Sequence, residues 1–182
     1  MRAAWPSRFF GVLLLACSAA SAGDYAADSG SLGFDYRVTF IGVRGSSSSV
    51  QAAVSFMLPD VSQASGSVTV KAASLRTGNS LQEDHMRGAL GAERYPDIVY
   101  TLSGVNTGAV LSEGQTLATT GLGKLTLKGV TRSLSVPLKL TLNSGKVNVA
   151  TQFKFNPYDF GVEYLGGSDS IAINVAFVLE AR

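Results

Sequence analysis

Few side chains in this sequence could do chemistry. Its 182 residues include one histidine, His85, and one cysteine, Cys17. Most zinc-type sites need three or four nitrogen or sulfur ligands, so the sequence predicts no metal site. A serine triad would need a serine and a carboxylate beside His85, but the serine run at 46–49 is distant in sequence and is typical of a flexible turn. We therefore predict a protein without a cofactor and without enzymatic activity. A hydrolase that uses His85 is the less favoured alternative.

One segment has a helical pattern, and it carries His85. Residues 80–83 have the Ser-x-x-Glu spacing of a capping box, which predicts a short helix that passes through Arg87 and stops before Gly88. Asp84 suits the first turn of such a helix, where the positive end of the helix dipole lies. The simplest role for His85 is structural, in a connection between two strands.

The first 22 residues have the features of a secretory leader. Arg2 and Arg8 supply the positive charge, and residues 9–16 supply the apolar stretch. Ala20-Ser21-Ala22 gives the small residues that precede a cleavage site. We therefore predict a signal peptide over residues 1–22 that is removed on export.

Cleavage at this site leaves a single domain, residues 23–182, which we expect in the periplasm. The full chain has 15 basic and 13 acidic residues, and losing Arg2 and Arg8 leaves 15 less 2, or 13, of each sign. A neutral chain without a basic patch gives no reason to expect nucleic acid as a partner.

A second interpretation of the N-terminus stays open, because residues 14–17 resemble a bacterial lipobox. In that case Cys17 would be lipidated and would anchor the protein to a membrane.

Most of the remaining chain alternates between apolar and polar residues, which is the period of a strand with one dry face. Eight strands with one dry face each can hide those faces by closing into a barrel or by folding into a sandwich. The predicted strands lie at residues 32–40, 50–56, 68–70, 98–102, 116–128, 134–142, 147–155 and 171–179.

Eight aromatic side chains fall on the dry faces of these strands. An eight-stranded barrel has a size at which side chains either fill the interior or leave space for one ligand. The residues alone leave both interpretations open. The aromatic residues are Phe34, Tyr36, Phe40, Phe56, Tyr100, Phe153, Phe155 and Phe177.

Four motifs follow one another along the chain. They are TGNSLQEDHMR at residues 77–87, ERYPDIVY at 93–100, GKLTLKGVTR at 123–132 and YDFG at 158–161. In this order and spacing, from about Leu32 to the C-terminus, the sequence resembles the YceI-like family. The members of that family are small, mostly exported bacterial proteins with a lipocalin-like barrel that binds polyprenyl or other long-chain lipids.

The resemblance implies an all-β fold, an eight-stranded antiparallel lipocalin-like barrel with one short helix between strands. It implies a long-chain lipid as partner: a polyprenyl lipid, an isoprenoid quinone or a fatty-acid derivative, which the barrel would sequester or carry. Transient membrane contact and a homodimer are further options. The eight aromatic residues would then contact the ligand, and His85, Asp84 and Arg87 would be polar candidates at the mouth. The alternative is a barrel with a filled core that acts as a structural or stress-related interaction protein.

The sequence departs from the family pattern at a few positions. Gly30-Ser31 stands where the family has His-Ser, and Gln82-Glu83 stands where it has Arg-Asp. Pro157-Tyr158 displaces the arginine before the Asp-Phe-Gly motif. These positions fall where the mouth of the barrel is expected. We therefore expect the departures to affect which ligand binds more than they affect the fold.

Overall fold

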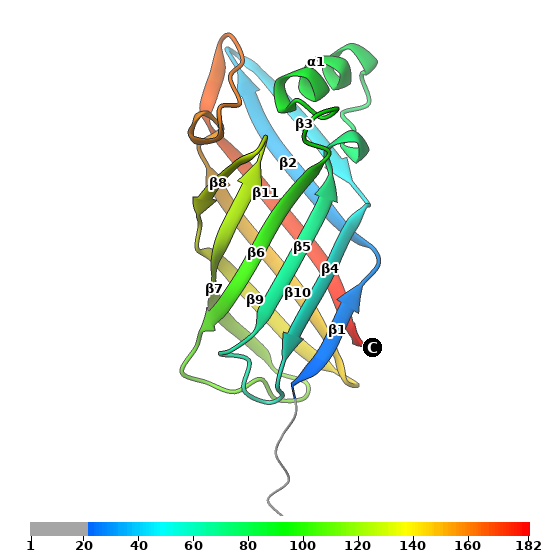
Figure 1. Ribbon diagram of the computed structural model, residues 1–182, viewed down its shortest axis with the longest axis vertical. Coiled ribbons are helices and arrows are strands. Elements are labelled where there is room, and N and C mark those ends of the chain that lie inside the picture. The colour runs from blue at the N-terminus through cyan, green and yellow to red at the C-terminus, as the bar shows by residue number, and fades with distance from the viewer. Residues whose placement is uncertain (1–21) are drawn as a thin grey trace, which may run out of the picture.

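The computed structural model describes residues 22–182, and within them eight antiparallel strands close into a barrel (Figure 1). The ring is completed where the first strand pairs with the last, Tyr25 opposite Ala181. This confirms the predicted barrel with one short helix. In ring order the strands are β1 (Gly23–Ala27), β4 (Val50–Phe56), β5 (Ser65–Lys71), β6 (Asp97–Asn106), β7 (Thr116–Leu127), β9 (Val136–Asn143), β10 (Lys146–Phe155) and β11 (Gly167–Ala181).

The first predicted strand, β2 (Gly30–Val38), lies beside this ring. The long strand β11 pairs with β1 near its C-terminal end and with β2 along the rest of its length. On its other edge β2 pairs with β3 (Ile41–Ser47). A further short strand, β8 (Val130–Ser133), pairs with the end of β7 through a turn at Lys128 and Gly129, both with positive φ.

The alternation of apolar and polar residues does not predict three of the observed strands, β1, β3 and β8. In β3 the residues Gly42, Gly45, Ser46 and Ser47 are small, so this strand carries almost no apolar signal. The expectation of a flexible turn at the serine run is therefore wrong, because its first half belongs to β3. Gly45 is required there, since a side chain at this position would collide with the Phe34 ring on β2.

The outer edge of β3 is also fixed. Ser46 N donates to Arg76 O at 2.8 Å, and Arg76 N donates back to Ser46 O at 2.9 Å. Arg76 follows a short 3-10 helix, η1 (Ala72–Ser74), in the connection that leads from β5 to the helix. These backbone bonds join the connection to the upper part of the barrel wall.

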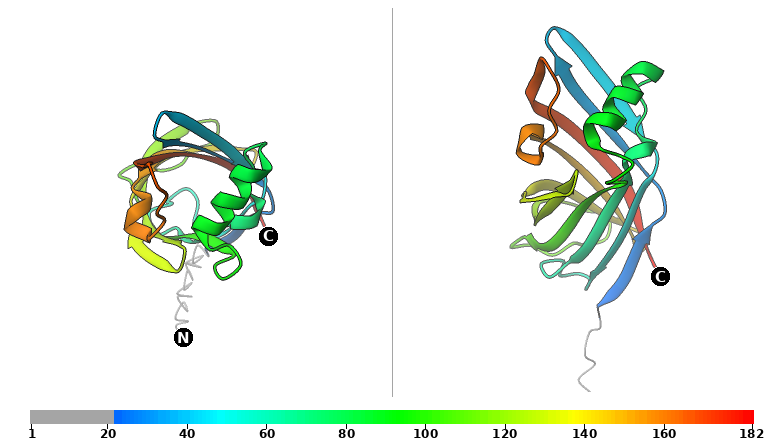
Figure 2. Two further views of the ribbon diagram at one scale, coloured as in Figure 1. Left: turned by 90° about the horizontal axis from the view of Figure 1, so that it is seen from above. Right: turned by 45° about the horizontal axis from the view of Figure 1, so that its top comes forward.

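The single α-helix, α1 (Ser80–Leu90), is longer than predicted. Asn79 is its N-cap and accepts from Gln82 N at 3.1 Å, so the cap lies one residue before the predicted one. The helix passes through Gly88 and ends at Gly91, which takes the left-handed conformation. Seen from above, α1 lies at one side of the barrel rim and the 3-10 helix η2 (Pro157–Phe160) at another (Figure 2).

The two ends of the barrel differ. At the end where the chain enters β1, called the closed end, loop residues Val61 and Leu111 are buried and fill the interior. The other end, called the mouth, is bounded by α1, the β2–β3 turn and the loop after η2 (Figure 1).

Among residues 22–182 there is no helix with the length and hydrophobicity needed to cross a bilayer. Residues 1–21 of the predicted leader, Cys17 among them, lie outside the described residues.

Candidate functional site

A cavity of about 400 Å³ runs through the barrel interior. Among the described residues, no lysine, arginine, aspartate or glutamate lines it. The polar residues in its lining are Gln82, His85, Thr151 and three tyrosines. Its volume is within the range of small-molecule sites, roughly 300–1,000 Å³. The barrel is therefore hollow and apolar, which decides the question of a filled or open interior that the sequence left open.

Seven of the eight predicted aromatic residues line this cavity, in two groups. Phe34, Phe56 and Phe177 are buried in the main core, and Phe56 stacks on Tyr25 with ring centroids 4.0 Å apart. The other four, Tyr36, Tyr100, Phe153 and Phe155, are only partly buried, so part of each ring faces the cavity space.

Phe40 is the exception, and the expectation that it faces the interior is wrong. Its side chain is 95% exposed and does not line the cavity. The reason is local: β2 ends at Val38, and Thr39 takes a positive φ of 54° in the turn to β3. The alternation that puts Phe34 and Tyr36 inside stops before it reaches Phe40.

Tyr100 is held by the barrel wall. Its hydroxyl donates to Leu134 O at 2.9 Å and to Gly121 O at 3.3 Å. Burial raises the pKa of Tyr100 to about 12. Gly123 leaves the space that the ring needs, since a Cβ there would lie 2.8 Å from the Tyr100 hydroxyl oxygen. The ring of Tyr100 thus faces the cavity, while its polar atom is already paired.

Tyr36 lies beside a second tyrosine, Tyr158. Burial, and then the neighbouring Tyr158, raise the pKa of Tyr36 above its usual value. Tyr158 donates its own hydroxyl to Gly167 O at 2.6 Å. Deeper in the barrel, Thr151 Oγ1 is buried without a hydrogen-bond partner among the described residues.

Helix α1 covers part of the mouth and turns one face into the cavity. His85 lines the cavity, and its Nδ1 lies 3.2 Å from the hydroxyl oxygen of Tyr164. Tyr164 belongs to the loop between η2 and β11, so this contact spans the mouth. No serine or carboxylate hydrogen-bonds the His85 ring within residues 22–182, so no described contact of the ring supports a hydrolase.

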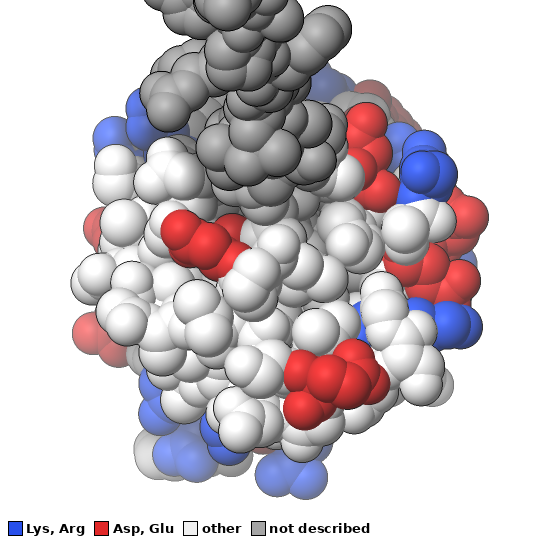
Figure 3. All heavy atoms as spheres, turned by 90° about the horizontal axis from the view of Figure 1, so that it is seen from below, with Lys and Arg blue, Asp and Glu red and all other residues white. Residues whose placement is uncertain are grey.

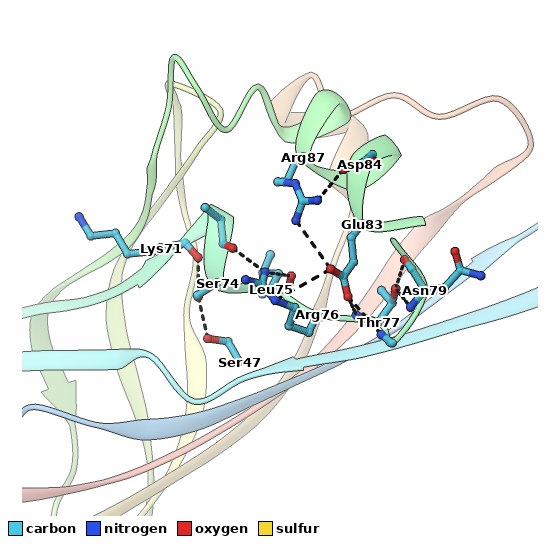
Figure 4. Close-up of polar contacts among 12 residues, drawn as sticks. Ser47, Lys71, Ser74, Leu75, Arg76, Thr77, Asn79, Glu83, Asp84 and Arg87 are labelled. Atoms are coloured by element: carbon cyan, nitrogen blue, oxygen red, sulfur yellow. Dashed lines mark hydrogen bonds and ion pairs between the residues drawn. The ribbon is translucent and has the colours of Figure 1, made fainter. Parts of the chain in front are cut away.

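Asp84 and Arg87, the other polar candidates, do not line the cavity. Arg87 Nη2 pairs with Asp84 Oδ1 at 2.5 Å (Figure 4). The expectation that they hold a ligand head group at the mouth therefore finds no support in their placement. On a helix, residues 84 and 87 share a face that differs from the face of residues 82, 86 and 89.

Glu83 is the centre of the polar network that fixes α1 to the barrel (Figure 4). Its Oε1 accepts from Thr77 N at 2.9 Å and from Gly78 N at 3.2 Å. Its Oε2 lies 3.9 Å from Arg76 Nε and 3.8 Å from Arg87 Nη1. The Thr77 N–H, helped by Gly78 and the two arginines, holds the pKa of Glu83 below its usual value.

A second pair of contacts extends the network to β3. Ser47 Oγ and Ser74 Oγ are 2.7 Å apart, and Ser74 Oγ donates to Lys71 O at 2.6 Å. Ser47 is a buried polar residue, so its hydroxyl needs this partner. The network thus explains how η1 and α1 are placed, and it leaves the cavity itself free of charge.

Sequence reasoning missed the apolar face of α1 and the loop tyrosine. The spacing of the helix residues could have revealed the first, because they recur at intervals of three and four. Nothing in the sequence places Tyr164 near His85. The missed lining residues of α1 and of the loop are Gln82, Met86, Ala89, Leu90, Val162 and Tyr164.

Comparison with solved structures identifies the same fold. BcnA from Burkholderia cenocepacia superposes with a TM-score of 0.71 at 20% identity, covering 82% of this chain and 95% of BcnA. A polyisoprenoid binding domain from Saccharophagus degradans, implicated in plant cell wall breakdown, gives 0.71 at 15% identity, covering 89% and 100%. The YceI protein of Campylobacter jejuni gives 0.62 at 21% identity, covering 80% and 88%.

No curated protein sequence matches the chain. The described residues contain no group of three or more histidine, cysteine, aspartate or glutamate side chains that could hold a metal ion.

The family model of the YceI-like domain matches residues 25–181, which is nearly the whole barrel. The chain belongs to the YceI-like family.

Proposed function

We propose that this protein is an exported, non-enzymatic carrier that holds a long-chain isoprenoid or a related lipid in its barrel. One observation carries the proposal: a cavity of about 400 Å³ that no charged side chain of the described residues lines. Apolar burial favours uptake at about 25 cal/mol for each Å² of ligand surface removed from water. A charged or strongly polar ligand would lose its hydration there without a compensating partner.

Two further facts support the lipid class. The chain belongs to the YceI-like family, and one structure with the same fold is a polyisoprenoid binding domain. An isoprenoid chain needs apolar contacts along its length and few hydrogen bonds, which suits rings such as Phe153 and Phe155. A polar head group would meet Gln82, His85 and Tyr164 at the mouth.

Export, membrane contact and dimer formation belong to the same proposal. Export to the periplasm rests on the leader predicted over residues 1–22. Transient membrane contact follows from the ligand class, because long-chain lipids are stored in membranes. A homodimer is tested by light scattering of the purified protein at several concentrations.

The ligand is identified by native mass spectrometry of the protein purified without detergent. We expect an added mass of a long-chain lipid, which lipid extraction and fragmentation then identify. Binding is measured with cis-parinaric acid, a fluorescent fatty acid, and with geranylgeraniol as the competing isoprenoid. A protein that carries no lipid and binds neither probe would contradict the proposal.

A pair of variants links binding to the cavity. Val175→Phe adds a ring at a partly buried position that lines the cavity, and we expect about tenfold weaker probe binding with little change in melting temperature. Ala52→Phe is the control, because Ala52 is 5% exposed in the packed core and does not line the cavity. There the added ring should cost roughly 1–3 kcal/mol of stability.

A further inference from the structure

Three apolar side chains at the mouth point into solvent. Phe40, Ile41 and Leu165 are 95%, 64% and 97% exposed. The first two lie in and beside the β2–β3 turn, and Leu165 lies in the loop between η2 and β11. Thr39 N donates to Gly166 O at 2.6 Å, so the two segments are joined (Figures 1 and 2). We call these three residues the apolar tip.

The apolar tip continues into the cavity. Ile41 is both exposed and part of the cavity lining, and the same is true of Tyr164, the neighbour of Leu165. An apolar surface therefore leads from the outside of the molecule into the barrel without a charged side chain in the lining. Exposed apolar side chains that gather at one place on a protein usually mark a site of interaction.

The closed end has a different character. Its loops carry acidic residues such as Asp60 and Glu113, and Figure 3 shows acidic side chains on this face. Burial of Val61 and Leu111 closes the interior on this side. Of the two ends of the barrel, the mouth is the one that offers a path for an apolar chain.

We propose that the apolar tip inserts into the surface of a lipid bilayer, so that the mouth opens directly into the membrane. The inference rests on the proposed function, because a lipid ligand could then pass between membrane and barrel without crossing water. A bilayer accepts separate apolar side chains without a matching shape. A protein partner would need more, since each side of a standard interface buries about 800 Å², well above what three side chains provide.

The first test is flotation with phosphatidylcholine vesicles. We expect the parent protein to float with the vesicles. The double variant Phe40→Ser with Leu165→Ser should bind the vesicles at least about tenfold more weakly than the parent. Both side chains are almost fully exposed, so the variant should fold normally. The matched control is Val110→Ser, because Val110 is 54% exposed on the loop of the closed end, and it should float like the parent. Binding should also change little with salt, since the three residues are uncharged.

The second test places a reporter in the membrane. In Phe40→Trp the new indole should be quenched by brominated phosphatidylcholine, whereas in Val110→Trp it should not. The sequence contains one tryptophan, Trp5 in the predicted leader, and its background is the same in both variants. Equal quenching in the two variants would overturn the proposed orientation.

The outcomes separate this inference from the proposed function. A parent protein that binds cis-parinaric acid in solution but does not float overturns the membrane inference alone. A parent that floats but binds no lipid probe overturns the proposed function alone. Equal loss of flotation in the Val110→Ser control overturns the role of the apolar tip. Loss of a dimer in the double variant, without flotation of the parent, would assign the tip to a second copy instead.

Discussion

At the scale of single residues, Tyr100 joins the cavity to the wall that surrounds it. Strand β7 pairs with β9 up to Gly121 and with β8 from Lys124 onward. The Tyr100 hydroxyl donates to Gly121 O and Leu134 O where this change of partner occurs. A ring that lines the cavity therefore also stabilises the barrel wall at the point where β7 changes partner.

Tyr100→Phe should lower stability at neutral pH by about 0.5–1.5 kcal/mol, because it removes these hydrogen bonds. The pKa of Tyr100 is about 12 in the folded protein, against an ordinary value of 10.0. The stabilisation is fully present below pH 10 and is lost as the pH rises through about 12, since the unfolded chain ionises first. In urea unfolding at pH 7, 10 and 11, the difference in free energy of unfolding between the parent and the variant should become smaller as the pH rises. A constant difference across this range would contradict the prediction.

At the scale of elements, α1 owes its position to polar contacts more than to burial. None of its residues is buried, while Glu83 receives two backbone N–H groups and lies near two arginines. The side chains that face the cavity, Met86 and Leu90 among them, are placed by this network. We therefore expect the position of the helix to depend on the charge of Glu83.

Glu83→Gln should lower the melting temperature at pH 7 by a few degrees, because a neutral amide holds the Thr77 and Gly78 N–H groups less strongly. The pKa of Glu83 is depressed below 4.5 in the fold. Its contribution is present above pH 4.5 and is lost as the pH falls through the lower folded pKa. The difference from the parent should thus shrink toward pH 3. Asp84→Asn, which removes an exposed ion pair, should have little effect at any pH.

The contact between His85 and Tyr164 should control how fast a ligand leaves. It joins α1 to the opposite loop across the mouth, and one hydrogen bond contributes about 0.5–1.5 kcal/mol. Tyr164→Phe should therefore speed the release of cis-parinaric acid by up to about tenfold in stopped-flow experiments.

His85→Ala should give a similar change, and the double variant should add nothing further, because both changes remove the same bond. Additive effects would mean that the two residues act separately.

At the scale of the whole molecule, the two ends of the barrel face opposite ways, and the described chain begins at the closed end. β1 begins at Gly23 beside Phe56, next to the buried loops of that end. A lipid anchor at Cys17 would attach shortly before this point. It would direct the mouth and its apolar tip away from the anchoring membrane, whereas a released protein can approach with its mouth first.

We therefore propose that the way the N-terminus is processed sets which membrane the mouth can reach. We expect N-terminal sequencing of the protein purified from the periplasm to begin at Gly23. Mass spectrometry should show no diacylglycerol on the chain. A start at a lipidated Cys17 would contradict plain export and would restrict the mouth to a facing membrane.

The amino-acid sequence by itself determined most of the barrel. The predicted strands correspond to β2, β4, β5, β6, β7, β9, β10 and β11, because each of them alternates between apolar and polar residues. The strands that it missed are short or, like β3, are built from glycine and serine, which carry no such signal. The aromatic rings of the cavity follow from the same alternation, apart from Phe40.

Only the tertiary structure decided that the barrel is hollow. Whether rings from different strands meet or leave a space depends on the summed volume of side chains across the barrel, and no single strand contains that information. The turn at Thr39 carried Phe40 to the outside, and the loop after η2 brought Tyr164 to His85 and Leu165 beside the turn. These contacts join residues far apart in the sequence, so their geometry exists only once the sheet has closed.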